Sequence, residues 1–469
     1  MAFRYGLSLV CLSFTLLSLL GCGAGVQQMR PDADSRPTIG GGYGDASQAV
    51  AAPEAKATET DYQGWKAYQL TNGLVTVVAV PDIGGRVMEY RLGSHPFIWT
   101  NPAEYGKLYE PPKTAAERKW HNFGGYKTWP APQSKWGGPP DPLGSQLEAA
   151  RWSGKILTSS GPTVRITMTS PEDPVTGLQL TRELALSAGS TSLQIHETFR
   201  NISQRELTWS IWGICQVPGQ LEPSQPFSRE ARVYIPLNPK SAHADGFCYL
   251  IAEKTDQWTK IANGRILQTS YGGKVGKIGT DSDAGWATYV DELHGFTFAQ
   301  TYTVTPGAEY PDQGSTTEVF TQSSADVPYM ELETLAPLKK LAPGEECSFD
   351  LDWHCAQVGG PTLKITSVAA LKTFPAAAWK GKQIVVSGEF GVFASGQVEL
   401  TFSDGAGKSL PSSVPPLKVS PAKSVVLKLT ATPPTGATKG MLTLCTEKGD
   451  KLGDIAEVLL TNTPAADKD

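Results

Sequence analysis

LQIHETFR, the sequence at residues 193–200, carries apolar side chains at alternating positions. Leu193, Ile195 and Phe199 fall on one side of an extended chain, and polar side chains fall on the other. The same period of two recurs at residues 164–169, where apolar and polar residues alternate strictly. Convincing amphipathic helices are absent. These patterns predict an all-β fold built around a large antiparallel β-sandwich.

Further along the chain, the composition changes after Cys355, where the sequence AQVGGP at residues 356–361 is typical of a linker. Short predicted strands then follow, separated by Gly-, Pro- and Ser-rich turns. We expect about 100 residues with this spacing, from 363 to 462, to form a small immunoglobulin-like β-sandwich. It is interpreted as a spacer or accessory module, with sugar binding or protein contact as the alternative. Residues 463–469 are expected to be a disordered tail.

The N-terminus predicts export. One positive charge precedes an apolar run from Gly6 to Leu20, which is too short for a membrane span and suits a lipoprotein signal peptide at residues 1–21. The run ends in a bacterial lipobox pattern, so Cys22 is the expected lipidation site. The alternative is an ordinary secretory signal. Residues 22–60 are rich in Gly, Ala, Asp, Ser and Pro and are expected to be a flexible tether.

Charge and cysteine content exclude several classes of function. The net charge is -5 and no basic cluster stands out, so nucleic acid is not an expected partner. Beyond Cys11 and Cys22, five cysteines remain at wide spacing, which matches neither a disulfide framework nor a zinc site. We expect buried free thiols, no metal and no cofactor.

The sequence WHNFGGYKTWPAPQ at residues 120–133, followed by WGGPPD at 136–141, is the strongest functional signal. It combines aromatic rings, hydrogen-bonding side chains and rigid Gly and Pro residues, as binding loops often do. Sugars suit such a surface, because their C–H edges pack on rings while their hydroxyls need polar partners. The alternative is an aromatic loop that only packs over the fold.

Several motifs together resemble a poorly characterised family of exported bacterial proteins within the galactose-mutarotase-like superfamily. The resemblance covers about residues 61–358 and implies a carbohydrate-binding β-supersandwich with its site in the concave face. It is distant from aldose 1-epimerases themselves. The motifs are IGGR (83–86), GGYKTWPAPQ (124–133), YPDQG (310–314), ELET (331–334) and LAPGE (341–345).

The resemblance also implies catalytic residues. Glu333, in a Leu-Glu-Thr segment, stands where epimerases carry their base, and Glu331 would share its face of a strand. The alternative is a pair of solvent-facing carboxylates. His121 is the candidate acid. Residues 209–213, where a second histidine would fall, contain tryptophans instead, which leaves epimerase activity open.

Other residues are candidates for substrate binding. Arg86 could clamp a ligand or bond loop carbonyls, and Asp312 could face the sugar or only form a turn. Arg182 falls on an apolar strand face and must be paired; we favour a structural ion pair over a ligand contact. The predicted binding residues are Arg86, Asn122, Lys127, Trp129, Gln133, Trp136, Trp212, Tyr310 and Asp312.

Taken together, these features predict a membrane-anchored lipoprotein of the bacterial cell envelope that binds mono- or oligosaccharides. One alternative is a sugar-active enzyme on the same scaffold, either epimerase-like with Glu333 as base or a glycosidase or lyase. The other is a structural envelope protein.

Overall fold

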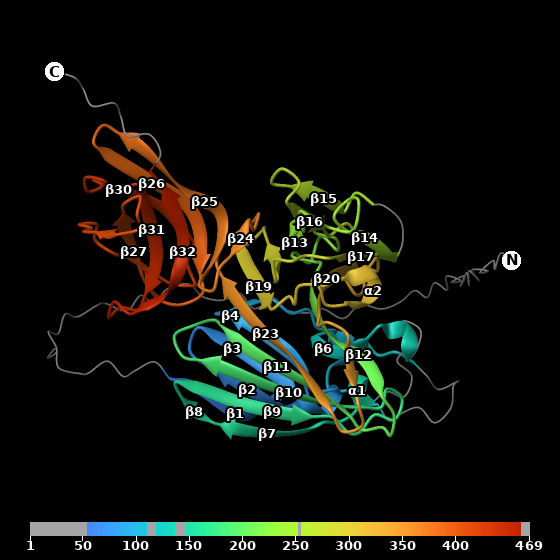
Figure 1. Cartoon of the computed structure of the whole chain (residues 1–469). Coiled ribbons are helices and arrows are strands. Elements are labelled where there is room, and N and C mark those ends of the chain that lie inside the picture. Colours follow the sequence, from blue (N-terminus) through green and yellow to red (C-terminus); the bar gives the residue numbers. More distant parts are fainter. Residues whose placement is uncertain (1–53, 110–118, 137–145, 252–254, 461–469) are drawn as a thin grey trace, which may run out of the picture. The chain divides into compact units, whose positions relative to one another are not determined.

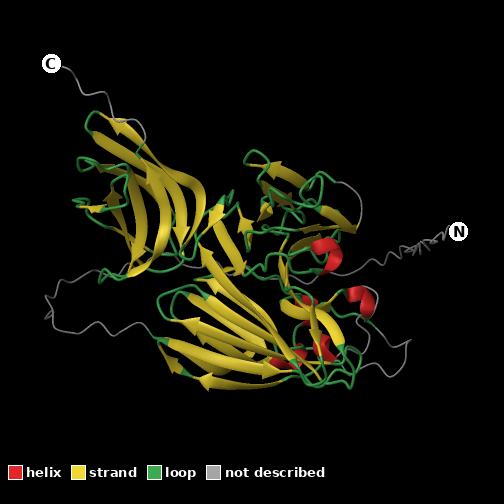
Figure 2. Cartoon of the chain, viewed as in Figure 1, coloured by secondary structure: helices red, strands yellow, loops and turns green. Residues whose placement is uncertain are grey.

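The computed structural model describes residues 54–109, 119–136, 146–251 and 255–460 (Figure 1). The predicted signal peptide, Cys22, most of the tether and the C-terminal tail lie outside these residues. Strands dominate, and the α-helices in the described part are the four-residue α1 (Gln146–Ala149) and α2 (Pro311–Gly314) (Figure 2). No helix among the described residues is long and apolar enough to cross a membrane.

The first layer is a 13-stranded antiparallel sheet. Strand β3 has the sequence VTVVAV, whose β-branched side chains favour an extended chain. In spatial order the strands are β14 (Cys248–Ile251), β17 (Gly276–Thr280), β20 (Thr317–Thr321), β21 (Tyr329–Leu335), β12 (Leu207–Pro218), β6 (Tyr126–Ala131), β4 (Arg86–Leu92), β3 (Val75–Val80), β2 (Trp65–Thr71), β1 (Ala55–Tyr62) and β8 (Ser160–Gly161), with β22 (Lys339–Leu341) beside β12 and β5 (His95–Pro96) beside β4.

The second layer is a 10-stranded antiparallel sheet. Leu193, Ile195 and Phe199 of β11 are at most 1% exposed, which confirms the alternation predicted for this strand. Its strands, in spatial order, are β15 (Trp258–Ile261), β16 (Ile266–Ser270), β13 (Ala231–Pro236), β18 (Trp286–Asp291), β19 (Phe296–Tyr302), β23 (Glu346–Ala356), β11 (Leu193–Asn201), β10 (Leu178–Ser187), β9 (Thr163–Thr169) and β7 (Ser153–Thr158).

One hydrophobic core lies between these two sheets and contains side chains from both. For example, Tyr126 of β6 packs edge-on against Trp353 of β23, with ring centroids 5.1 Å apart. We call this two-sheet unit the first sandwich. It begins at β1, so its first strand starts at Ala55, a few residues before the boundary predicted at residue 61.

A buried ion pair of the 10-stranded sheet, between β10 and β11, is bonded to the other layer inside the first sandwich. Arg182 Nε lies 2.7 Å from Glu197 Oε1, and both side chains are fully buried. Arg182 also donates to Thr128 Oγ1 of β6 at 2.7 Å and to the Gly85 carbonyl, so each of its nitrogens has an oxygen acceptor. Arg182, which the sequence analysis expected to be paired, is therefore bound by partners between the sheets.

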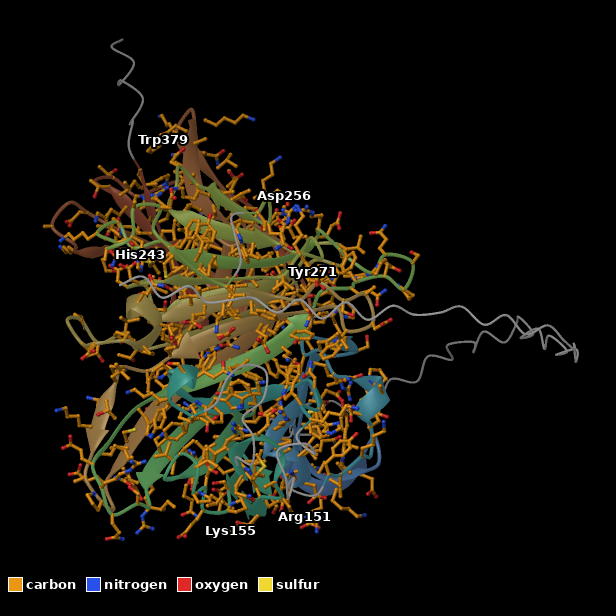
Figure 3. The ribbon with its side chains drawn as sticks, turned by 90° about the vertical axis from the view of Figure 1, so that its right-hand side faces the viewer. Arg151, Lys155, His243, Asp256, Tyr271 and Trp379 are labelled. Atoms are coloured by element: carbon orange, nitrogen blue, oxygen red, sulfur yellow. The ribbon has the colours of Figure 1, made fainter. Side chains whose placement is uncertain are left out.

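The second sandwich follows the linker and has its own core. The predicted all-β fold, a large supersandwich followed by a small β-sandwich, is thereby confirmed. Figure 3 labels Lys155 of the first sandwich and Trp379 of the second. The second sandwich comprises a four-stranded sheet, β24 (Lys364–Ile365), β25 (Ala369–Lys380), β26 (Gln383–Val392) and β30 (Val425–Ala431), and a five-stranded sheet, β28 (Ser409–Leu410), β27 (Gly396–Ser403), β31 (Lys439–Cys445) and β32 (Lys451–Leu459), with β29 (Leu417–Val419) beside β27.

The cysteines in the described residues are free, as predicted. Cys215, Cys248, Cys355 and Cys445 are buried, and Cys347 is half-buried. Burial raises the pKa of the Cys215 thiol well above its usual value, so this group stays protonated and unreactive at neutral pH.

Candidate functional site

Strand register brings charged residues together on one face of the 13-stranded sheet. Lys127 of β6 lies opposite Ile214 of β12, Ile214 lies opposite Glu333 of β21, and Glu333 lies opposite Glu318 of β20. Directly paired residues of antiparallel strands share a face. Thr128, the neighbour of Lys127, contacts the buried ion pair between the sheets. The charged row therefore occupies the opposite face, which we call the outer face.

Two carboxylates on the outer face share one lysine. Lys277 of β17 places its Nζ 2.6 Å from Glu318 Oε2 and 2.9 Å from Glu333 Oε2. The same ammonium lies 4.2 Å from the ring centroid of Trp212, whose indole Nε1 donates to Glu333 Oε2 at 2.6 Å. Both glutamates are fully buried, and Lys277 is 9% exposed. This carboxylate–lysine–carboxylate group carries one more negative than positive charge when fully ionised.

Burial sets the protonation behaviour of this group. It raises the pKa of Glu333 well above the usual value, and Glu318 adds to the rise while Lys277 opposes it. The pKa of Glu318 is raised for the same reason. Burial alone would lower the pKa of Lys277, but the two carboxylates outweigh it and raise that pKa. Two close carboxyls with raised pKa values can hold one proton between them, which is the property that acid–base catalysis requires.

A second charged group lies at the β6 side of the outer face. Arg86 Nη2 is 2.6 Å from Glu148 Oε1, and that carboxylate also accepts hydrogen bonds from Trp129 Nε1 at 2.5 Å and Trp120 Nε1 at 3.2 Å. Lys127 Nζ lies 3.7 Å above the Trp129 ring. Among the described residues it forms no ion pair or hydrogen bond, although its side chain is 3% exposed.

Partly exposed groups surround Glu331 on the same face. Glu331 is half-buried and accepts a hydrogen bond from Gln216 Nε2 at 2.8 Å. Phe320 lies directly opposite it on β20 and is also half-buried. Trp99 keeps partial exposure and packs on Tyr329, with ring centroids 4.8 Å apart. This end of the outer face offers a carboxylate, an amide and aromatic rings to a ligand.

His121 lies apart from the outer-face carboxylates. Its ring stacks on Tyr109 at 3.4 Å, and its Nδ1 is 3.8 Å from Glu104 Oε2. Burial lowers the pKa of His121, and Glu104 opposes that change. None of the described histidines forms an ion pair with Glu333, and the role of His121 as the acid stays a prediction.

Arg86 and Asn122 make internal bonds. Arg86 donates to the Gly124 carbonyl at 3.0 Å and to Glu148 Oε1. The first of these bonds is of the kind expected as the alternative to ligand binding, a hydrogen bond to a loop carbonyl. Asn122 Oδ1 accepts from the Gly124 amide at 3.2 Å, while its Nδ2 has no partner among the described residues. Both residues hold the turn that leads into β6.

The predicted tryptophans form the buried floor of the outer face. Trp129, Trp136 and Trp212 are 5%, 7% and 3% exposed. Trp129 packs edge-on against both Trp136 and Trp212, at 5.4 and 5.6 Å between ring centroids. The ring faces of Trp129 and Trp212 are covered by Lys127 and Lys277, so these rings position the lysines.

Three further predicted residues lie in loops. Gln133 is half-buried, and its Nε2 has no partner among the described residues. The Tyr310 hydroxyl accepts a hydrogen bond from the Thr305 amide at 2.9 Å. Asp312 lies in α2 with a positive φ of 49°. Burial raises its pKa and Lys277 opposes the rise, which places Asp312 near the shared lysine.

Four residues of the outer face could not be predicted from the sequence. Lys277 and Glu318 come from strands without a distinctive motif, and only the position of Glu318 beside Val319 and Phe320 in the strand Thr317–Thr321 could have marked it. Glu148 sits in a single helical turn, and Trp99 follows a short apolar run. Their roles depend on strand register across elements that are far apart in sequence.

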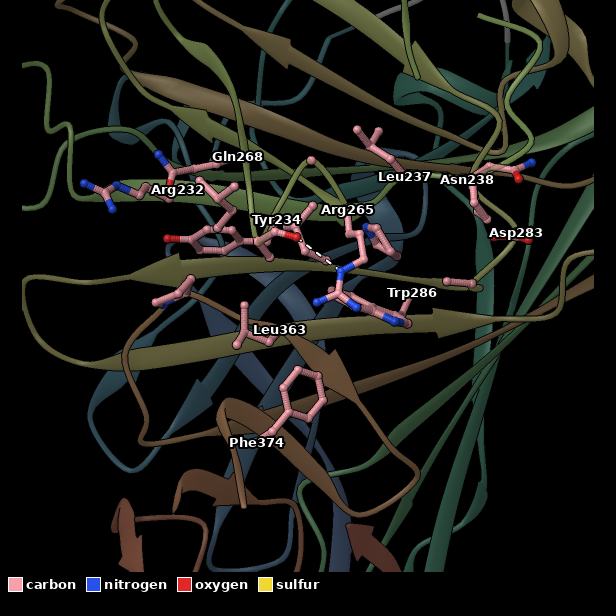
Figure 4. A pocket seen from close by; sticks show the side chains of 18 residues that line it. Arg232, Tyr234, Leu237, Asn238, Arg265, Gln268, Asp283, Trp286, Leu363 and Phe374 are labelled. Carbon is pink, nitrogen blue, oxygen red and sulfur yellow. Dashed lines mark hydrogen bonds between the residues drawn. The ribbon is translucent and has the colours of Figure 1, made fainter. Parts of the chain in front are cut away.

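Figure 4 shows a separate pocket of about 690 Å³, and none of the predicted site residues lines it. Trp286, Arg265 and Phe374 are among its lining side chains. In the described part of the chain, no group of three or more His, Cys, Asp or Glu side chains could hold a metal ion.

Comparisons with known proteins leave the activity unassigned. A family model described as a domain of unknown function, DUF4380, matches residues 66–356. No curated protein matches the sequence. Solved structures that match include a TPR-domain containing protein from Parabacteroides distasonis, with 14% identity and a TM-score of 0.45, covering 64% of this chain and 49% of that one.

Two further solved structures are galactose mutarotase-like proteins. The one from Clostridium acetobutylicum is 13% identical with a TM-score of 0.42, covering 64% of this chain and 98% of its own. The one from Lactobacillus casei is 11% identical with a TM-score of 0.43, covering 62% and 99%. These likenesses are too distant to assign an activity or a site.

Proposed function

The chain belongs to the DUF4380 family, and from this premise we propose that its first sandwich binds carbohydrate on the outer face of the 13-stranded sheet. The observation that carries the proposal is the row of buried charged residues, Lys127, Glu333 and Glu318, on that face. A folding core gains nothing from concentrating so many charges on a side of the sheet that faces away from the main sandwich interior. A ligand rich in hydroxyl groups would use them as donors and acceptors.

Aromatic rings with partial exposure support a sugar ligand. Trp99, Trp120 and Phe320 are half-buried, in contrast to the covered Trp129 and Trp212. A sugar ring packs its C–H edges on such faces while its hydroxyls bond neighbouring carboxylates and amides. The Glu331–Gln216 pair beside Phe320 supplies those polar groups.

A second candidate function is acid–base catalysis on the bound sugar, favoured by the geometry around Lys277. Opening of an aldose ring requires a base that removes the anomeric proton and an acid that protonates the ring oxygen; closure reverses both steps. Glu333 would act as the base, as its Oε1 has no hydrogen-bond partner among the described residues. Glu318, whose pKa is raised, would supply the acid in place of His121. A glycosidase or lyase would use the same two carboxyls.

The cellular location is also part of the proposal. The apolar N-terminal run that ends in Leu20-Gly21-Cys22 supports lipid attachment at Cys22 and a place in the bacterial cell envelope. Mass spectrometry of the N-terminal peptide from the native host would detect a diacylglyceryl-modified cysteine. An unmodified N-terminus starting elsewhere would contradict the anchor.

Proton NMR of freshly dissolved pure anomers of aldoses, with and without the full chain, tests both candidates. Binding predicts line broadening of the sugar signals, and catalysis predicts faster anomer exchange that Glu333→Gln abolishes. Trp99→Ala should weaken the sugar affinity by about fivefold or more, because stacking on an aromatic ring contributes on the order of 1–3 kcal/mol.

The matched control is Trp379→Ala, which removes a half-buried tryptophan from the second sandwich. It should leave sugar binding unchanged. If no sugar signal responds to the wild-type chain, or if both tryptophan variants change binding equally, the outer face is not the carbohydrate site. Either result would favour the alternative of a structural envelope protein.

A further inference from the structure

We propose that the sugar bound on the outer face carries a carboxylate, as a hexuronic acid does, and that Lys127 binds this carboxylate. The inference rests on the proposed carbohydrate function and deepens it by naming the class of sugar. The carboxylates around Lys127 already have hydrogen-bond donors of their own.

Lys127 is the cation that the outer face leaves without a carboxylate. Its side chain is 3% exposed, and its Nζ lies 3.7 Å above the Trp129 ring and 5.4 Å from the Trp120 ring. A cation over aromatic rings is stabilised when it is desolvated. That stabilisation is smaller than the cost of burying an ammonium group. All three of its hydrogen-bond donors are unused among the described residues.

The neighbouring carboxylates are held by other donors. Glu148 accepts from Arg86, Trp120 and Trp129. Glu333 is occupied by Lys277 and Trp212. No oxygen of these two carboxylates comes within 4.0 Å of Lys127 Nζ. Their negative charges nevertheless act to raise the pKa of Lys127.

The third neighbour, Glu331, is bound by Gln216 and is half-buried. Its carboxylate has no cation paired with it among the described residues, so it would repel an anion. Glu148 and Glu331 oppose the effect of burial, which nevertheless lowers the pKa of Lys127. We therefore place the ligand carboxylate at the Lys127 end of the outer face and the sugar hydroxyls toward Glu331, which accepts their hydrogen bonds.

A carboxylate satisfies this lysine better than a hydroxyl. A charge-assisted hydrogen bond is roughly twice as strong as a neutral one, and the added negative charge offsets the cost of burying the ammonium. Glucuronate and glucose differ only at C6, where one has a carboxylate and the other a hydroxymethyl group. The pair isolates the contribution of that charge.

Isothermal titration calorimetry of the full chain with D-glucuronate, D-galacturonate, D-glucose and D-galactose tests the inference. At neutral pH we expect each uronate to bind at least tenfold more tightly than its neutral counterpart. Lys127→Met, which keeps the apolar stem, should reduce that ratio to near one. Lys135→Met is the matched control, since Lys135 is exposed and lies 5.7 Å from a different ring, that of Trp209; it should keep the ratio.

Several outcomes would overturn the inference, and they are distinguishable. Equal affinity for uronates and neutral sugars would refute the carboxylate assignment and leave the proposed carbohydrate function intact. Binding of acetate as tight as that of glucuronate would show an anion site with no sugar recognition. A uronate preference that survives in Lys127→Met would place the carboxylate elsewhere. No binding of any of the four sugars would count against the proposed function itself.

Discussion

Two buried ionic groups of the first sandwich, one between the sheets and one on the outer face, differ in how completely their charges are matched. Between the sheets, Arg182 and Glu197 form a one-to-one pair, and every nitrogen of the arginine has an acceptor. On the outer face, one lysine, Lys277, serves both Glu318 and Glu333. Lys127 has no carboxylate at all among the described residues.

This difference indicates which charged residues stabilise the fold and which remain available to a proton or a ligand. The interior pair is matched one charge to one charge, and although Glu197 Oε2 has no hydrogen-bond partner among the described residues, no net charge is left over for a ligand. An unequal cluster costs stability and can be completed only by a proton or by a bound group. Such imbalance is typical of functional sites, where stability is given up for chemistry.

The largest expected effect lies in the interior cluster. Arg182→Met leaves Glu197 buried without its counter-ion, so the free energy of unfolding should fall by about 3–5 kcal/mol. The double variant Arg182→Met with Glu197→Leu should recover most of the loss, because no charge stays buried. Urea denaturation followed by fluorescence measures both. A single variant as stable as the wild type would show that the pair does not join the sheets.

Lys277→Met should lower stability in a pH-dependent way. Without the ammonium, the folded-state pKa values of Glu318 and Glu333 rise further above the unfolded value near 4.3. A raised carboxyl pKa stabilises the fold below the unfolded value and loses this contribution as pH rises through the folded value. The deficit relative to wild type should therefore grow above pH 5, to about 3 kcal/mol at pH 7.5. Urea titrations at pH 5 and 7.5 measure it; a deficit independent of pH would contradict the shared-proton account.

Lys127→Met should have the smallest effect, and it should be stabilising. The folded-state pKa of Lys127 is depressed, so the unfolded chain holds the proton more tightly and the wild type is destabilised below that pKa. Replacing the ammonium with a thioether should raise the free energy of unfolding by about 1 kcal/mol at pH 7. The gain should vanish above pH 10.5, where the amine is neutral in both states. Destabilisation at pH 7 would mean that the lysine has a structural partner.

Much of the fold follows from sequence because strand periodicity is local. Leu193, Ile195 and Phe199 all face the core, as their spacing predicted. The strands beyond Cys355, among them β26, β27, β30 and β31, also occur where alternation and turn residues indicated. The start of the first strand at Ala55 was harder to locate, because residues 55–60 contain few large apolar side chains.

The site could be predicted only in part, because it depends on register. Glu333 and Glu331 share the outer face because they are two residues apart in one strand. Lys277 and Glu318 join them only through pairing of β17, β20 and β21, which no local pattern encodes. His121 has a side chain that can act as an acid, and it was predicted from the sequence for that reason. In the structure its contacts are with Tyr109 and Glu104.

The most direct test of the account is the sugar affinity of two matched variants, Glu197→Gln in the interior and Glu333→Gln on the outer face. Calorimetric titration, with affinity corrected for the folded fraction, separates a structural from a functional carboxylate. The account predicts that Glu197→Gln keeps the wild-type affinity in its folded molecules, whereas Glu333→Gln loses at least tenfold while remaining folded. Equal affinities in both variants would contradict the claim that the outer face is the binding site.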